Sequence, residues 1–372
     1  MSIKPEARYI MLGGFLGAGK TTSVLQLARY FDSKGLTVGL ITNDQGERLV
    51  DTAMLASNGF SVEEIAGGCF CCRFHSLQDA AENLTLDTSP DVFIAEAVGS
   101  CTDLVATVSY PLRRIYGDRF SIAPLTVVID PRRALRIFGL ETGKSFSSKV
   151  LYIYKKQLEE SQIILMNKCD TIDVEQRTAL ESTLRAEYPE AKVITCSARD
   201  GDGLSVWFDY LQNNDMNFGR VMDVDYETYG SGEARLGWLN AAIHLSSNDW
   251  IDGNELLKKF TQQVQTSLKL NDLEIAHLKM TLAPEDETGG LAIINLVGSD
   301  FDAEASQTLM DDVERGEIIV NIRAEAPPET LEKVLRDAVA ACTDKITTLH
   351  LEHLERFAPG QPVPVYREGI GA

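Results

Sequence analysis

The chain has 372 residues, of which 44% are hydrophobic and 24% are charged, and its formal net charge is −20. This length allows two domains, and the composition is that of an ordinary soluble globular protein. The negative charge argues against a nucleic-acid partner, because proteins that bind phosphate backbones carry basic patches. No stretch approaches the roughly 18 apolar residues of a membrane helix, and no signal peptide is recognisable, so we expect a cytoplasmic protein without a membrane partner.

The first half of the chain alternates short apolar runs with helical patterns. A strand predicted over 9–12 leads through a glycine-rich loop into a helix over 22–30. Further buried strands are predicted at 37–42, 92–95, 125–129, 163–166 and 192–195. A helix predicted over 175–188 separates the last two of them. Apolar strands separated by helices are typical of a mostly parallel sheet with helices on both faces, so we predict an α/β domain of the P-loop NTPase type over residues 1–212.

The pattern changes after a polar stretch at 213–232, which we interpret as a linker. Beyond it, residues 275–282 alternate between apolar and polar side chains, as expected of a strand with one buried face. The other elements predicted within 233–372 are strands at 237–245, 291–297, 317–322 and 345–351 and helices at 254–268, 303–313 and 329–341. Up to residue 322 their order is βαββαβ, which predicts a smaller α+β domain of the ferredoxin-like class.

The segment GFLGAGKT at positions 14–21 has the Walker A pattern of a phosphate-binding loop, with a predicted strand before it and a helix after it. In such a loop the backbone N–H groups surround the phosphates, the lysine reaches the β and γ oxygens, and the hydroxyl after it binds Mg²⁺. The residues predicted to bind the phosphates are Gly14, Gly17, Ala18, Gly19, Lys20, Thr21 and Thr22.

A second motif, NKCD at positions 167–170, is predicted to select the base. The carboxylate of Asp170 can accept hydrogen bonds from N1–H and the 2-amino group of guanine, a donor pair that adenine lacks. Asn167 can form a hydrogen bond on the O6 side of the purine, and the aliphatic part of the Lys168 side chain can pack on the plane of the base. Ser197 and Ala198 follow the next strand and are predicted to add backbone contacts. We therefore expect GTP and GDP as ligands.

Glu96 ends a predicted strand, and Gly99 follows three positions later. In P-loop enzymes an acid at this point reaches Mg²⁺ directly or through water, and the glycine N–H can sense the γ-phosphate. We predict that Lys20, Thr21, Glu96 and Gly99 carry out GTP hydrolysis. The predicted Mg²⁺ ligands are Thr21, Glu96 and Asp51. An ordinary exposed acid at the end of a strand is the alternative interpretation of Glu96.

Three of the seven cysteines lie in the segment GGCFCCRF at positions 67–74. Cys69 and Cys71 share one side of an extended chain, whereas Cys72 requires a turn to join them. Such thiolates suit zinc or another thiophilic transition metal, and three ligands leave one position for exchange. A disulfide, for which Cys69–Cys72 is the only comfortable local spacing, and buried unreactive thiols are the alternatives. We interpret the isolated cysteines as packing residues: Cys101, Cys169, Cys196 and Cys342.

Taken together, these motifs resemble the CobW-type P-loop GTPases, relatives of the hydrogenase and urease nickel-insertion GTPases. The resemblance covers about the first 210 residues. It rests on GGFLGAGKTT at 13–22, TNDQG at 42–46, GGCFCC at 67–72, EAVG at 96–99, QLEESQ at 157–162 and NKCD at 167–170. It implies a nucleotide-gated metallochaperone that holds Zn²⁺, Co²⁺, Fe²⁺ or Ni²⁺ through the three clustered cysteines and delivers the metal to a metalloprotein client.

The chain departs from the family pattern at several points. NDQG at 43–46 stands where the family often has NEFG, and EAVG at 96–99 stands for ETSG. Histidine-rich tracts are absent, and the C-terminal half lacks an Arg-x-His motif. The metal, the client and the formation of a homodimer therefore stay open. Further candidate ligands, with solvated or capping side chains as the alternative, are His75, Glu47, Glu63 and Glu64. Two other functions fit the same residues: a regulatory GTP switch with a structural zinc, and a GTP-dependent activator of a metal- or corrinoid-dependent enzyme.

Overall fold

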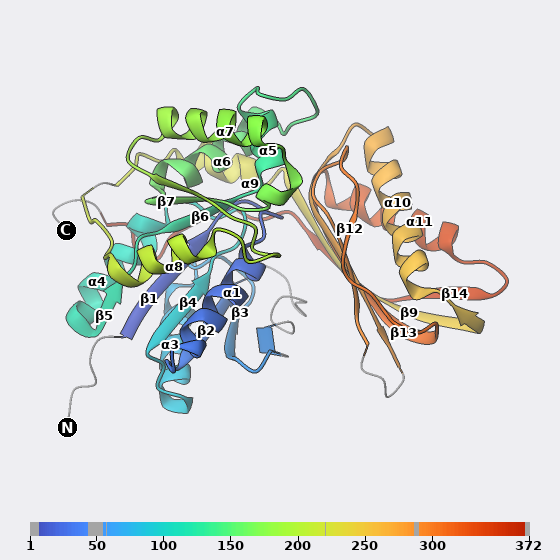
Figure 1. Ribbon diagram of the computed structural model, residues 1–372. Coiled ribbons are helices and arrows are strands. Elements are labelled where there is room, and N and C mark those ends of the chain that lie inside the picture. The colour runs from blue at the N-terminus through green and yellow to red at the C-terminus, as the bar shows by residue number, and fades with distance from the viewer. Residues whose placement is uncertain (1–6, 44–54, 57, 220, 286–289, 369–372) are drawn as a thin grey trace. The chain divides into compact units, whose positions relative to one another are not determined.

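The computed structural model describes residues 7–43, 55–56, 58–219, 221–285 and 290–368. The chain divides into two compact units (Figure 1). The first unit comprises Met1–Thr142, Leu151–Tyr229 and Gln361–Ala372, and the second comprises Gly143–Val150 and Gly230–Gly360.

The first unit is built on a parallel sheet with the strand order β3-β2-β4-β1-β6-β7-β8, in which β5 also pairs with β1. Its strands are β1 (Ala7–Gly13), β2 (Val38–Asn43), β3 (Ser61–Ile65), β4 (Val92–Glu96), β5 (Phe120–Ile122), β6 (Thr126–Ile129), β7 (Ile163–Met166) and β8 (Lys192–Thr195). The register aligns Thr42 with Glu96 and Asn43 with Ile65. The carboxyl ends of β2, β3 and β4 therefore meet at one edge of the sheet, where open α/β sheets bind their ligands.

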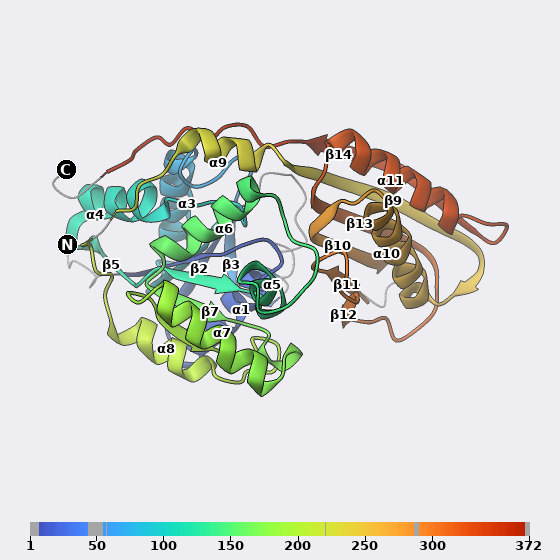
Figure 2. The ribbon, with the colours of Figure 1, turned by 90° about the horizontal axis from the view of Figure 1, so that it is seen from above.

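Helices cover both faces of this sheet, as Figures 1 and 2 show. They are α1 (Lys20–Ser33), α3 (Phe74–Asp87), α4 (Tyr110–Tyr116), α5 (Pro131–Ile137), α6 (Ser148–Glu160), α7 (Val174–Glu187) and α8 (Leu204–Asn213). Helix α9 (Tyr226–Glu233) continues from the first unit into the second, since the boundary between them falls after Tyr229. Helices α1 and α8 share one apolar cluster, in which the ring of Tyr30 lies 4.6 Å from that of Phe208. The α/β fold predicted for this part of the chain is confirmed.

The second unit contains an antiparallel sheet with the order β12-β11-β10-β13-β9-β14. Its elements are β9 (Leu236–Ile251), α10 (Gly253–Leu270), β10 (Glu274–Pro284), β11 (Ala292–Leu296), β12 (Glu304–Gln307), β13 (Val313–Glu325), α11 (Pro328–Cys342) and β14 (Thr347–Phe357). The central order β10-β13-β9-β14, with α10 and α11 in the connections, is the split βαββαβ arrangement. Strands β11 and β12 extend the β10 edge of that sheet.

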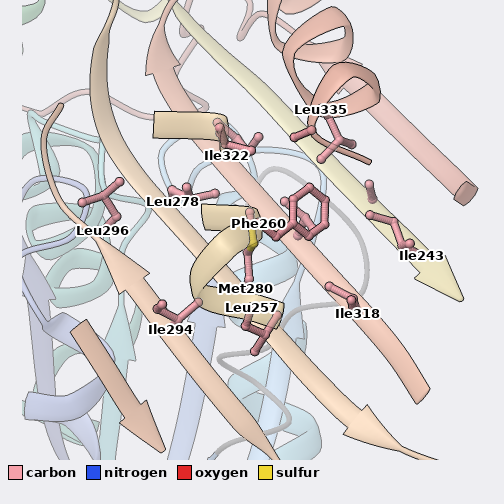
Figure 3. Close-up of a cluster of buried hydrophobic side chains, with 14 of the residues drawn as sticks. Ile243, Leu257, Phe260, Leu278, Met280, Ile294, Leu296, Ile318, Ile322 and Leu335 are labelled. Carbon is pink, nitrogen blue, oxygen red and sulfur yellow. The ribbon is translucent and has the colours of Figure 1, made fainter. Parts of the chain in front are cut away.

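The core of the second unit lies between its two helices and one face of the sheet. Figure 3 shows Leu257 and Phe260 of α10 among strand residues that include Met280 and Ile318. Asp252 caps the start of helix α10, and its carboxylate accepts hydrogen bonds from the N–H groups of Asn254 and Glu255 in the first turn. This cap fixes the start of an amphipathic helix whose apolar side then faces the sheet.

The helix predicted over 303–313 is wrong, because this part of the chain holds strand β12 and no helix. The buried residues Phe301, Leu309 and Val313 are spaced as on a helical face. The segment instead pairs as an edge strand with β11, and this pairing overrides the local periodicity. The second helix of the βαββαβ unit is therefore α11.

Residues 143–150 were predicted to lie in the first domain but belong to the second unit, and residues 361–368 were predicted to lie in the second domain but belong to the first unit. The segment 361–368 hydrogen-bonds with residues of the first unit, for example Glu368 N with the carbonyl of Ala106 at 2.9 Å. Within the second unit, Lys144 Nζ lies 2.6 Å from Asp272 Oδ1, and Ser147 N donates to Glu325 Oε2 at 2.8 Å. None of the helices formed by the described residues combines the length and the apolar character needed to cross a membrane.

Candidate functional site

The glycine-rich loop connects β1 to the 14-residue helix α1. Gly14 has a φ of 127°, and a Cβ at this position would lie 2.2 Å from the carbonyl oxygen of Val128, so only glycine fits there. Lys20 is the first residue of α1 and is buried. The loop thus passes close to the sheet and ends at a helix N-terminus, which is the geometry that binds phosphate groups.

Glu96 and Gly99, predicted from the sequence, lie beside this loop. Thr21 Oγ1 donates a hydrogen bond to Glu96 Oε1 at 3.0 Å. A hydroxyl and a carboxylate at this separation are oxygen donors of the kind that Mg²⁺ prefers. A Cβ on Gly99 would lie 2.7 Å from Cδ2 of Leu16, so this glycine packs directly against the loop. Asp51, the third predicted Mg²⁺ ligand, lies outside the described residues, as does Glu47.

The NKCD segment is attached to the same loop. Asn167 Nδ2 donates to the carbonyl of Ala18 at 3.0 Å, and Asn167 Oδ1 accepts from the N–H of Ala198 at 2.8 Å. Lys168 Nζ donates to the carbonyl of Gly17 at 2.7 Å. The phosphate loop, the NKCD segment and the loop after β8 are therefore joined through side chains that the sequence analysis assigned to base binding.

Asp170 and Ser197, two further residues predicted to bind the base, each have a polar or charged partner in the structure. The carboxylate of Asp170 pairs with Arg199 at 2.5 Å, and its side chain is 20% exposed. Ser197 Oγ hydrogen-bonds with Asp200 Oδ2 at 3.0 Å. Arg199 therefore forms an ion pair with the carboxylate that is predicted to bind guanine. This ion pair was not predicted from the sequence.

Asp130 is a buried residue of this site that the sequence analysis missed. Its Oδ1 accepts a hydrogen bond from the N–H of Arg133 at the start of α5, and its Oδ2 pairs with Lys168 Nζ at 2.9 Å. Burial would raise the pKa of Asp130, but the charges of Lys168 and Arg133 lower it below its ordinary value. The ionised carboxylate thus fixes the lysine that the NKCD motif supplies. The available signal was an acid directly after an apolar strand and before a proline.

The three clustered cysteines come together in one turn between β3 and α3. Gly67 and Gly68 precede this turn, which is closed by hydrogen bonds from Cys72 N and Arg73 N to the carbonyl of Cys69 at 3.0 and 2.9 Å. The Sγ atoms are 2.8 Å apart for Cys69 and Cys71, 3.4 Å for Cys69 and Cys72, and 3.6 Å for Cys71 and Cys72. All three are free thiols, and only Cys72 is partly exposed.

The protonation of these thiols is linked. Hydrogen bonds from Cys101, Cys71 and Cys72 lower the pKa of Cys69 well below its ordinary value. The hydrogen bond to Cys69 is also the main reason why the pKa of Cys72 is raised to about 11. One thiolate is therefore held by neighbouring thiols. Such a donor set suits a thiophilic cation, which binds thiolates at about 2.3 Å and displaces their protons.

Asn43 connects the cysteine turn to the sheet. Its Nδ2 donates to the carbonyls of Ile65 and Gly68 at 2.9 and 2.6 Å. Asn43 ends β2, and its neighbour Thr42 is paired with Glu96. The cysteine turn and the carboxylate beside Thr21 are thus attached to adjoining strands at the same edge of the sheet.

The other ligand candidates do not join the three sulfurs. Among the described residues, the cluster whose ligand atoms all lie within 4.8 Å contains only the three cysteines. His75 Nδ1 lies 2.9 Å from Gln78 Oε1, and Glu63 accepts a hydrogen bond from Asn83. Glu63 and Glu64 belong to β3, before the turn.

Two further contacts of the cluster were not predicted. Cys101, interpreted as a packing residue, lies near enough to Cys69 to lower the pKa of that thiol, although it is outside the cluster whose ligand atoms all lie within 4.8 Å of one another. The N–H of Val363 donates to Cys72 Sγ at 3.3 Å. The sequence offers no signal for the second contact, and for the first it offers only the position of Cys101 shortly after Gly99.

Residues 8–195 match the domain described as "CobW/HypB/UreG, nucleotide-binding domain". The zinc chaperone YeiR of Escherichia coli is 30% identical over 174 residues, which are 46% of this chain and 49% of that protein. The zinc chaperone CobW of a Sinorhizobium species is 27% identical over 187 residues, 44% of this chain and 51% of that protein. The chain thus spans about half the length of these curated relatives. The crystal structure of HypB from Helicobacter pylori in complex with nickel covers 55% of this chain and 86% of its own, with 18% identity and a TM-score of 0.40.

Proposed function

Because the chain belongs to the CobW/HypB/UreG family through residues 8–195, we propose that it is a GTP-hydrolysing metallochaperone. In this proposal Cys69, Cys71 and Cys72 carry the metal, and GTP turnover controls its delivery to a client metalloprotein. Zinc is the first choice of metal, since two relatives are named zinc chaperones. A cytoplasmic location belongs to the proposal because thiols stay reduced there.

The observation that carries the proposal is the convergence of three free thiols next to the strand ends of a nucleotide-binding fold. The sulfurs lie 2.8 to 3.6 Å apart, and Asn43 ties their turn to the strand beside Glu96. A purely structural metal site would not require this position. A carrier does require it, because nucleotide-dependent movement at the strand ends then reaches the metal ligands.

For hydrolysis we propose that Lys20 supplies positive charge at the β and γ oxygens and that the N–H of Gly99 senses the γ-phosphate. Mg²⁺, held by Thr21 and Glu96, would neutralise the charge that develops on the phosphate oxygens. Asn167, Lys168 and Asp170 would orient the guanine, with backbone contacts from Ser197 and Ala198. The support for these roles is that Asn167 and Lys168 each contact the phosphate loop directly.

Burial of Cys69 and Cys71 favours a second candidate, a GTP switch with a structural zinc, because buried thiolates exchange metal slowly. A variant with all three cysteines replaced by serine tests the metal site in both cases. We expect it to lose stoichiometric zinc, measured by elemental analysis, and to keep GTP binding. Retention of one zinc per chain would refute the assigned ligands, and zinc that is never released to a chelator in any nucleotide state would favour the switch.

A further inference from the structure

The segment 361–368 crosses the first unit and lies on the cysteine turn. Near its start, Gln361 Nε2 donates to the carbonyl of Tyr226 in α9 at 3.5 Å, and at its other end Glu368 pairs with Arg114 of α4 (Figure 2). All of these residues belong to the first unit, which also holds the nucleotide motifs and the three clustered thiols. We call this segment the strap.

The strap contacts the cysteine turn through its backbone. Val363 N donates to Cys72 Sγ at 3.3 Å, and Val365 N donates to the carbonyl of Cys71 at 2.9 Å. Val363 and Val365 are themselves 73% and 40% exposed. The polar contacts with the turn are therefore made by main-chain N–H groups, which hold the strap next to the sulfur of Cys72.

The sequence of the strap favours this docked conformation. Pro362 and Pro364 alternate with the two valines. Proline has no N–H and fixes φ near −65°, so the two prolines lower the conformational entropy that the strap loses when it docks. They also leave Val363 and Val365 as the backbone donors of this stretch, and both of these donors contact the turn.

The far end of the strap is held by a buried carboxylate. Arg367 Nε donates to Asp103 Oδ2 at 2.7 Å, and the Asp103 side chain is 1% exposed. Glu368 N donates to the carbonyl of Ala106 at 2.9 Å. Because hydrogen bonds between charged groups are about twice as strong as neutral ones, this end is the firm attachment of the strap.

An aromatic contact holds the strap beside the turn. The rings of Tyr366 and Phe74 meet edge to face, with their centroids 5.2 Å apart, and the guanidinium of Arg114 lies 5.4 Å from the Tyr366 ring centre. Phe74 is buried and is the first residue of α3, shortly after the three cysteines. Tyr366 therefore packs on the helix that begins where the turn ends.

The strap lies on the most accessible of the three thiols. Cys69 and Cys71 are buried, with 6% and 1% of their surfaces exposed, whereas Cys72 is partly exposed. An acceptor that takes metal from this site has to approach Cys72. The backbone of Val363, at hydrogen-bonding distance from the Cys72 sulfur, occupies part of that approach.

We propose that the strap closes the cysteine turn and has to detach from it before an acceptor can exchange with Cys72. Its role in metal delivery rests on the function proposed above, whereas its position over Cys72 does not. In the exchange, a thiolate of the acceptor replaces the Cys72 thiolate on the metal. The proton that the acceptor thiol loses passes through solvent to Cys72, and no oxidation or reduction takes place.

Two maleimides of different size test the strap on the full-length apoprotein. N-ethylmaleimide and the bulkier N-(1-pyrenyl)maleimide both react with the thiolate of Cys72, and mass spectrometry measures the two rates at this residue. Because the same thiolate reacts in both cases, the ratio of the rates does not depend on the pKa of Cys72. A strap over Cys72 hinders the bulky reagent more than the small one, so loosening the strap should raise the rate ratio of bulky to small reagent.

Two substitutions loosen the strap without touching its hydrogen bond to Cys72. Val365→Pro removes the N–H that contacts the carbonyl of Cys71, and Val365→Ala keeps that N–H as the matched control. Tyr366→Ala removes the ring that packs on Phe74, and Tyr366→Phe keeps it. We expect the rate ratio to rise about 2- to 10-fold in Val365→Pro and in Tyr366→Ala, the effect of losing one hydrogen bond or one aromatic contact. Both control variants should match the wild type, and GTP binding and circular dichroism establish that all chains are folded.

An unchanged ratio in both Val365→Pro and Tyr366→Ala, or an equal rise in their controls, would overturn the proposal. In zinc-loaded chains, transfer of zinc to a chelator should accelerate in the same two variants, and transfer at the wild-type rate would overturn the role of the strap in delivery. If the wild type binds zinc and the ratio does not change, the proposed function survives and the strap is lost. If the ratio rises but no chain binds zinc, the strap stands over Cys72 and the proposed function fails.

Discussion

Glu160, the last residue of α6, carries a buried carboxyl group that we predict to weaken the fold as the pH rises. Its Oε1 accepts a hydrogen bond from Thr102 Oγ1, and its Oε2 accepts one from Val105 N, both at 3.1 Å. Burial, and secondly the nearby Asp103, raises the pKa of Glu160 from 4.5 to about 8. Glutamine has the same shape without the charge, and its amide can donate to the Thr102 hydroxyl while its oxygen accepts from Val105.

The direction of this pH effect depends on whether the folded or the unfolded chain keeps the proton of Glu160. Below pH 4.5 the carboxyl is protonated in the folded and the unfolded chain alike. Between pH 4.5 and about 8 the unfolded chain loses this proton while the folded chain retains it, so the free energy of unfolding falls as the pH rises. At about 1.4 kcal/mol per pKa unit, the loss is on the order of 3 kcal/mol at pH 7, and it levels off above the folded-state pKa.

Calorimetric unfolding of the wild type, Glu160→Gln and Glu159→Gln measures this effect over about pH 5 to pH 8. At the upper end of this range Glu160→Gln should be more stable than the wild type, and its free energy of unfolding should change less steeply with pH. Glu159, which pairs with Lys156 and is 33% exposed, is the matched control and should retain the wild-type slope. Equal slopes for the wild type and Glu160→Gln would refute the reasoning.

Three further predictions concern nucleotide chemistry. Lys20→Ala should reduce GTP hydrolysis by at least about 100-fold, because the transition state loses positioned positive charge; near-normal phosphate release would mean that another loop holds the phosphates. Thr21→Ala should raise the Mg²⁺ concentration needed for half-maximal hydrolysis, and an unchanged Mg²⁺ requirement would contradict the predicted ligand. Asp170→Asn should weaken GTP binding about 10- to 100-fold in calorimetric titration, the effect of losing a charged hydrogen bond. Efficient hydrolysis of ATP by the wild type would contradict the assignment of the NKCD motif.

The sequence predicted the first unit well because its signals are local. The six strands that were predicted there are short apolar runs, and the phosphate loop and NKCD are contiguous motifs placed directly after strands. Strands β3 and β5 were missed, because β3 (SVEEI) contains two glutamates and β5 has only three residues. The helix predicted at 303–313 failed because the partner of that segment is strand β11, and local periodicity does not reveal a strand partner.

The parts of the site that could not be predicted are contacts between distant residues. Val363 and Cys72 are 291 positions apart, and Arg199 and Asp170 are 29 positions apart. The motifs that contain Cys72 and Asp170 do not indicate these partners, and Val363 and Arg199 belong to no recognised motif. Cys101 was interpreted as a packing residue because an isolated cysteine carries no signal until the fold brings it to Cys69.

The most direct test of the central proposal is the zinc affinity of the wild-type chain, measured by chelator competition with GDP and with a non-hydrolysable GTP analogue. We predict that the two affinities differ by about 5- to 150-fold, the range typical of coupled sites. The cysteine turn and Glu96 are attached to adjoining strands, so a change at the γ-phosphate should reach the metal ligands. Identical affinities in the two nucleotide states would contradict the account of this protein as a nucleotide-controlled metal carrier.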